Sequence, residues 1–116
     1  MKRGFRLSRP ADFKRVRRLG KSYTHPFVVL VVLTNDATDP PVGSSLRVGV
    51  AAGRSVGGAV QRNRAKRVLR AAMQPLLQRI KPGHDLVLIA REAILASSSQ
   101  QAQGVLERLL QRAKLL

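Results

Sequence analysis

The sequence of 116 residues contains no cysteine, no tryptophan and few aromatic side chains of any kind. Without cysteine, the chain forms neither disulfides nor thiolate metal sites. Aromatic residues make up only 3% of it, so Leu, Val, Ile and Ala must do most of the packing in a core. The longest apolar run, Phe27 to Leu33, is far too short to span a bilayer. The basic N-terminus continues into Asp12 and further arginines, which speaks against a signal peptide and makes the cytoplasm the expected location.

Acidic residues are also scarce, because six Asp and Glu stand against 22 Lys and Arg, for a formal net charge of +16. Such a charge repels itself in the compact state and is favourable mainly beside a polyanion. Nucleic acid is the first candidate, since neutralising its phosphates releases condensed counterions, and an anionic membrane is the second. Hydrophobic residues still make up 44% of the chain, which is enough for a core and excludes a disordered polycation.

Hydrophobic patterning and turn residues predict one domain over residues 1–116. The expected elements are a helix from a Ser8 cap to Leu19, strands over 22–34 and 46–52, a helix over 59–74, a strand over 85–90, and a last helix from Ser97–Ser99 to about Ala113. Residues 35–45 should form an exposed turn, with the two flanking strands paired as an antiparallel hairpin. Val28–Leu33 is apolar on both faces, as in a strand covered on both sides. The order α-β-β-α-β-α indicates a single α/β sandwich.

The predicted helix over 59–74 has two different sides. At 100° per residue its apolar stripe consists of Ala65, Val68, Leu69, Ala72 and Leu76. The opposite side carries Asn63, Arg64, Lys66, Arg67 and Arg70, with Arg62 at the seam. No acidic residue occurs between Asp39 and Asp85, so like charges repeat along this side and weaken the helix. We interpret the side as a nucleic-acid phosphate contact rather than a solvated surface.

Catalysis by the protein itself would need carboxylates that hold metal ions or a histidine placed as a base. Asp36 and Asp39 fall in the predicted turn and are interpreted as turn formers. His25 and His84 lack an adjacent acid or base in a motif, which favours structural roles. Gly57-Gly58 lacks the Lys-Ser/Thr of a nucleotide-binding loop, so it indicates a sharp entry into the helix. The sequence therefore predicts no catalytic side chain and defines no metal site.

A block with specific spacing surrounds this helix. It consists of Arg47-Val48-Gly49-Val50, Gly57, Ala59-Val60 and Arg62-Asn63-Arg64-x-Lys66-Arg67-x-x-Arg70. Further matching residues are Arg6-Leu7, Asp12-Phe13-x-x-Val16 and Gly20 upstream, and Asp85-x-x-x-Ile89-Ala90-Arg91 downstream. Over about residues 2–92 the chain resembles the protein subunit of bacterial ribonuclease P.

The resemblance implies a mixed β-sheet packed with helices, in a fold shared with a small-subunit ribosomal protein. It also implies a left-handed crossover through the basic helix, an exception to the usual right-handed rule. The residues that fall on the family's motif for binding the catalytic RNA are Arg62, Asn63, Arg64, Lys66, Arg67 and Arg70, with Arg54 just before it. Phe13 falls on an aromatic position facing the 5′ leader of precursor tRNA. Two other cleft positions, often aromatic in the family, are Arg17 and Leu30 here, which implies cationic and aliphatic contacts in place of stacking.

By this resemblance the chain is expected to be an accessory subunit of a tRNA-maturing endonuclease. Its partners would be the catalytic RNA and precursor tRNA, without a membrane or a required protein partner. Cleavage would come from Mg²⁺ bound mainly by the RNA. The alternatives are a structural ribosomal or ribosome-assembly protein, and a DNA-compacting or membrane-surface protein. The Arg62-Asn63-Arg64 spacing argues against both, and the chain lacks the aromatic-anchored amphipathic helix of a membrane-surface protein.

Overall fold

The structure is a computed structural model that describes residues 5–34 and 46–116. Its helices are α1 (Pro10–Leu19), α2 (Ala59–Met73) and α3 (Ser99–Arg112). Its strands are β1 (Lys21–Thr24), β2 (Val28–Thr34), β3 (Leu46–Ala52) and β4 (His84–Ala90). Short 3-10 turns are η3 (Arg54–Val56), η4 (Gln74–Arg79) and η5 (Glu92–Ala96). The turn predicted over 35–45, with Asp36 and Asp39, lies outside the described residues.

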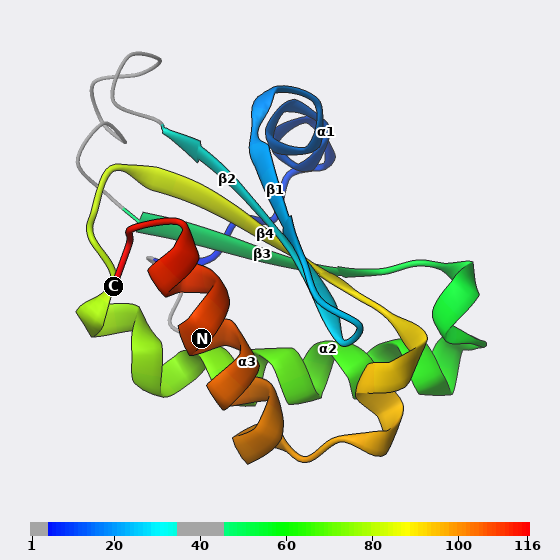
Figure 1. Ribbon diagram of the computed structural model, residues 1–116. Helices are drawn as coiled ribbons and strands as arrows, with labels where there is room; N and C mark the ends of the chain where they lie inside the picture. The colour runs from blue at the N-terminus through cyan, green and yellow to red at the C-terminus, as the bar shows by residue number, and fades with distance from the viewer. Residues whose placement is uncertain (1–4, 35–45) are drawn as a thin grey trace.

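The four strands form one mixed sheet in the order β1-β2-β4-β3 (Figure 1). The predicted hairpin between residues 22–34 and 46–52 is wrong, because β4 lies between β2 and β3. It pairs antiparallel with β2 and parallel with β3. A strand as apolar as β4 is most stable at the centre of a sheet, where both of its faces are covered. Helix α2 supplies the crossover that two parallel neighbours require. The left-handed sense of this crossover stays a prediction.

The segment 22–34, predicted as one strand, is two strands joined by a tight turn. β1 pairs antiparallel with β2, with Thr24 opposite Val29. Between them the His25 N–H donates to the Val28 carbonyl over 3.0 Å, and the Val28 N–H donates to the His25 carbonyl over 3.2 Å. Pro26 has no N–H to give to a ladder, so the chain reverses at this point instead of continuing as a strand.

Helices cover both faces of the sheet, as Figure 1 shows, with α2 and α3 on one side and α1 alone on the other. The large core lies on the α2 and α3 side, where its most deeply buried side chains include Leu30, Leu69, Met73, Leu76, Leu86, Leu88, Leu106 and Leu110. The small cluster under α1 consists of Leu7, Val16, Val31 and Val87. The prediction that Val28–Leu33 is covered on both faces is confirmed.

The helix ends follow local chemistry. Helix α1 begins with Arg9 at the N-cap and Pro10 in its first turn, so the predicted Ser8 cap is wrong, whereas Gly20 ends the helix as expected. Helix α2 ends at Met73, because Pro75 cannot donate the next hydrogen bond, and η4 begins there. Helix α3 is capped by Ser98, which exchanges side-chain and backbone hydrogen bonds with Gln101 over 3.1 and 2.9 Å.

Candidate nucleic-acid interface

The entry into α2 is a sharp glycine turn, as predicted. Gly57 has a φ of +141°, a conformation that side chains rarely adopt, and Gly58 is the N-cap. The Arg62 N–H donates to the Gly58 carbonyl over 2.9 Å, which closes the first turn. Arg54 is exposed in η3, immediately before this turn, so it lies near the beginning of the basic helix.

Helix α2 is two-sided, which confirms the predicted geometry. Its buried residues are Ala65, Leu69, Ala72 and Met73. Its outer side chains are the exposed Asn63, Arg64 and Arg67 and the half-buried Arg62, Lys66 and Arg70. In the part of the chain that the structure describes, no cation of α2 takes part in an ion pair. These charges are therefore available to an external anion, and we refer to the six side chains as the outer face of α2.

Val60 adds an apolar side chain to that surface. It is 75% exposed, and at 100° per residue it falls beside Arg64 and Arg67. Sequence reasoning used Val60 only as part of a family motif and missed its exposure. The sequence signal for this exposure is the position of Val60 outside the apolar stripe of the helix.

Phe13 lies on the opposite face of the sheet, against β3. A Cβ atom built on Gly49 would lie 2.5 Å from Cζ of Phe13, so the ring fits only because residue 49 is glycine. The half-buried ring lines a small hollow of about 190 Å³ together with Arg6, Leu7, Ser8, Val48, Val50 and Arg70. The structure therefore brings Phe13 of α1 and Arg70 of α2 to one site at the β3 edge of the sheet. No local pattern in the sequence predicted this meeting.

Leu30 does not face this side of the sheet, and its predicted contact with the leader is wrong. Its side chain is fully buried, with 0% exposure, in the large core under α2 and α3. Neighbouring residues of a strand point to opposite faces, so a shift of one position exchanges the faces. Val29, next to Leu30, is half-buried and packs beside the α1 cluster, as does Leu33. Arg17 is exposed on α1, as a cationic cleft residue requires.

An ionic network holds α1 on the sheet. Asp85 of β4 is 0% exposed and accepts two hydrogen bonds from Arg47, at 3.0 Å from Nε and 2.7 Å from Nη2. It also accepts one from Nη2 of Arg15 at 2.5 Å. Asp12 lies 3.2 Å from Nη1 of Arg15 and 3.8 Å from Nη1 of Arg47. Two arginines and two aspartates balance in charge, so this network is structural, unlike the outer face of α2.

The comparisons agree with this arrangement. The family model for ribonuclease P matches residues 1–114 of the chain. The chain belongs to the ribonuclease P protein family. The ribonuclease P protein component of Herpetosiphon aurantiacus is 38% identical over 115 residues, 99% of this chain and 89% of that protein. The component from Symbiobacterium thermophilum is 40% identical over 116 residues, 100% of this chain and 96% of that protein.

Solved structures of the family share the fold. The Staphylococcus aureus ribonuclease P protein superimposes with a TM-score of 0.78 at 28% identity, covering 96% of each chain. The Thermotoga maritima protein gives a TM-score of 0.75 at 26% identity, covering 92% of this chain and 96% of that one. These matches confirm the predicted mixed sheet with helices. They identify a protein component of ribonuclease P, a tRNA-processing endonuclease with an RNA subunit, and give no support to the ribosomal alternative.

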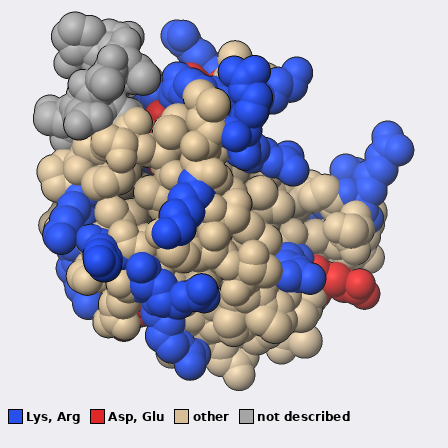
Figure 2. All heavy atoms as spheres, turned by 45° about the horizontal axis from the view of Figure 1, so that its top comes forward, with Lys and Arg blue, Asp and Glu red and all other residues tan. Residues whose placement is uncertain are grey.

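Among the charged side chains on the surface of this ribonuclease P protein, basic ones far outnumber acidic ones. Figure 2 shows them in several groups on one face of the molecule, with few acidic atoms between them. Among residues 5–34 and 46–116, no three His, Asp or Glu side chains are grouped as metal ligands. No helix in the same described ranges is long and apolar enough to cross a membrane.

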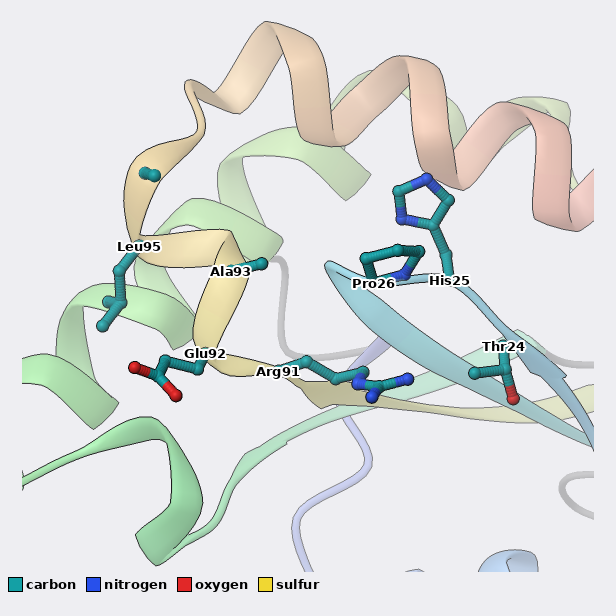
Figure 3. A pocket seen from close by; sticks show the side chains of 8 residues that line it. Thr24, His25, Pro26, Arg91, Glu92, Ala93 and Leu95 are labelled. Atoms are coloured by element: carbon teal, nitrogen blue, oxygen red, sulfur yellow. The ribbon is translucent and has the colours of Figure 1, made fainter.

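A larger hollow, of about 720 Å³, lies between the β1–β2 turn and η5 (Figure 3). Its walls include His25, Pro26, Arg91 and Glu92, and none of the predicted site residues. Figure 3 shows Arg91 extending toward Thr24, whereas Glu92 points the other way. The hollow is therefore separate from the outer face of α2 and from the Phe13 site.

Proposed function

We propose that the outer face of α2 docks this ribonuclease P protein on the catalytic RNA. The observation that carries the proposal is the set of cations on α2 that have no carboxylate partner within the described residues. Arginine forks match phosphate oxygens, and each neutralised phosphate releases counterions. Asn63 stands exposed among them, where its amide can both donate to and accept from RNA groups. Arg54, exposed in η3, adds one more cation near the beginning of the helix.

The 5′ leader of precursor tRNA is proposed to follow the α1 side of the sheet. The small hollow supports this path, since it combines a ring, Phe13, with the guanidinium groups of Arg6 and Arg70. Single strands are bound by such combinations, in which bases stack on aromatic rings and cations follow the backbone. Arg17 provides a further exposed cation on α1. Leu30 has no part in this path because it is buried on the other face.

Phosphodiester cleavage is assigned to the RNA subunit and to Mg²⁺ that it holds. Bound Mg²⁺ supplies charge stabilisation and an activated nucleophile in such reactions. Supporting this assignment, three of the four acidic side chains within the described ranges, Asp12, Asp85 and Glu107, are engaged by arginines. The protein would raise affinity for the substrate and screen the repulsion between two RNAs. It would act in the cytoplasm and require no protein partner.

Reconstitution tests this function. The purified chain is added to bacterial ribonuclease P RNA at low Mg²⁺, and 5′ maturation of a precursor tRNA is measured. We expect the chain to stimulate cleavage, because its cations replace part of the screening that Mg²⁺ would otherwise provide. An absence of stimulation at every Mg²⁺ concentration would reject the proposal.

The leader path has its own test in Phe13→Ala. This variant should bind leader-bearing precursor with less preference over mature tRNA, because one stacking surface worth about 1–3 kcal/mol is lost. Val16→Ala is the matched control, since Val16 is a fully buried residue of the same helix. If both variants lose affinity equally for precursor and mature tRNA, Phe13 acts only by packing.

A further inference from the structure

A second cationic surface lies between β1 and α3, away from the outer face of α2. Lys21 and Tyr23 of β1 and His25 just after it alternate along the chain, so they point to one side. Arg108 and Arg112 are one turn apart on α3 and share a side of that helix. We call these five residues the β1–α3 face.

Contacts around Tyr23 show that the two elements form one surface. The Lys21 Nζ atom lies 5.5 Å from the centroid of the Tyr23 ring, and the Arg112 guanidinium carbon lies 5.8 Å from the same centroid. Figure 3 shows the His25 ring directed toward α3. The positive charge of Arg108 is close enough to help lower the pKa of His25, after the larger effect of burial. Tyr23 therefore holds two cations in place by cation–π attraction.

These cations have no counter-charge within the described ranges. Glu107 is adjacent to Arg108 in sequence, but its carboxylate contacts Arg79 at 3.3 Å. The remaining ion pairs there involve Asp12 and Asp85. Arg108 and Arg112, at i and i+4, repel each other and weaken α3. Apart from the Tyr23 ring, these like charges have only one another and a neutral histidine beside them, so an external anion would relieve their repulsion.

The chemistry of the face fits the phosphates of RNA. The Phe27 N–H donates to Nδ1 of His25 over 3.0 Å, so the neutral ring carries its proton on Nε2 and can donate it to an anion. Arg108, Arg112 and Lys21 supply the charge. A membrane surface would need exposed apolar anchors. Among the described residues the exposed large apolar side chains are Leu19 and Val60, on α1 and α2.

We propose that the β1–α3 face binds RNA backbone phosphates as a surface independent of the outer face of α2. Because α2 and α3 contribute separate sets of cations, the protein can hold RNA at two places on its helical side. The phosphates belong either to the catalytic RNA or to precursor tRNA, and both present the same chemistry.

The test compares variants of equal charge. Arg108→Gln combined with Arg112→Gln removes two cations from the face. Arg79→Gln combined with Lys81→Gln, both exposed and outside the face, removes two elsewhere. Binding is measured against salt in two arms, the full chain with bacterial ribonuclease P RNA and the assembled holoenzyme with precursor tRNA. The Arg108 and Arg112 pair of substitutions should reduce the magnitude of the slope of log K against log salt by about 1–2 in one arm. The arm in which this happens shows whether the face binds the catalytic RNA or precursor tRNA.

Two further variants sharpen the result. Adding Lys21→Gln to the Arg108 and Arg112 pair should lower the same slope again, because Lys21 belongs to the other side of the face. Arg64→Ala with Arg67→Ala tests docking by α2 independently, so failure of that proposal is distinguishable from failure of this one. If the β1–α3 variants show the slopes of the Arg79 and Lys81 control in both arms, the β1–α3 face does not bind RNA.

Discussion

At the residue scale, Asp85 is the side chain on which the α1 side of the molecule depends most. Helix α1 has one fully buried residue, Val16, so apolar packing alone attaches it weakly. Asp85 adds charged hydrogen bonds from Arg15 on α1 and from Arg47 on β3. The carboxylate therefore ties one helix and two strands together at a point without water access.

Asp85→Asn should lower the free energy of unfolding by about 3 kcal/mol, because removing one partner leaves buried charges without compensation. Urea denaturation followed by circular dichroism measures the change. Glu107→Gln is the control, since its pair with Arg79 is partly exposed and should contribute less than about 1 kcal/mol. Equal effects of the two substitutions would show that the Asp85 network is no stronger than a surface pair.

His25 links stability to pH. Burial, with a smaller effect from Arg108, lowers the pKa of His25 from 6.5, so the unfolded chain binds this proton more readily than the folded one. The stability that depends on a neutral His25 is therefore fully present above pH 6.5 and is lost as the pH falls toward the folded-state pKa of His25. The His25→Asn variant keeps an acceptor for the Phe27 N–H. Between about pH 8 and pH 5, its melting temperature should fall less than that of the wild type. Identical pH profiles would exclude this role.

At the element scale, α2 has two sides of different composition. Its buried side packs on the sheet through apolar residues, whereas the cations of its outer face form no ion pair with any described residue. Because the two sides follow from the same period of 3.6 residues, a substitution on the outer face should have little effect on packing and so can test the proposed RNA contact separately. The separation makes α2 suitable for testing RNA contacts one residue at a time.

Arg64→Ala and Arg67→Ala should each weaken binding to bacterial ribonuclease P RNA and reduce the salt slope by about one unit. Both side chains are exposed, so neither substitution should change the melting temperature by more than a few degrees. Filter binding over a salt series provides the slopes. Arg79→Gln serves as a surface control. A slope that stays at the wild-type value would place Arg64 and Arg67 outside the RNA contact.

At the scale of the whole molecule, charge opposes compactness. The protein carries a net charge of +16 within extents of 39 × 26 × 24 Å. At 0.01 M salt the Debye length is about 30 Å, so charges repel across most of the molecule, whereas at 0.15 M it is about 8 Å. Stability in solution therefore depends on ions that are not part of the chain.

The melting temperature should rise with salt from 0.01 to about 0.15 M, and differential scanning calorimetry measures it. Combining Arg64→Gln with Arg67→Gln lowers the net charge by two and should reduce this rise, because less repulsion remains to be screened. A melting temperature that is constant or falls over the same range would mean that local ion pairs outweigh the overall repulsion.

The sequence by itself determined what depends on local period and residue type. The two-sided α2, its glycine entry, the break at Pro75 and the Ser98 cap were all predictable, because each depends on residues within a few positions of one another. The unbalanced charge and the spacing of Arg62-Asn63-Arg64 also led to RNA and to the family without any coordinates.

The tertiary structure decided what depends on how distant segments meet. Pairing of β4 with both β2 and β3 follows from covering apolar faces across the whole sheet, and adjacency along the chain misled the hairpin prediction. Leu30 was expected on the α1 side of the sheet but points into the large core. Only the register of β2 within the sheet decides which alternate residues face each side. Likewise, Phe13 lines one hollow with Arg70, and Asp85 binds Arg15, because the fold brings together residues that are 57 and 70 positions apart.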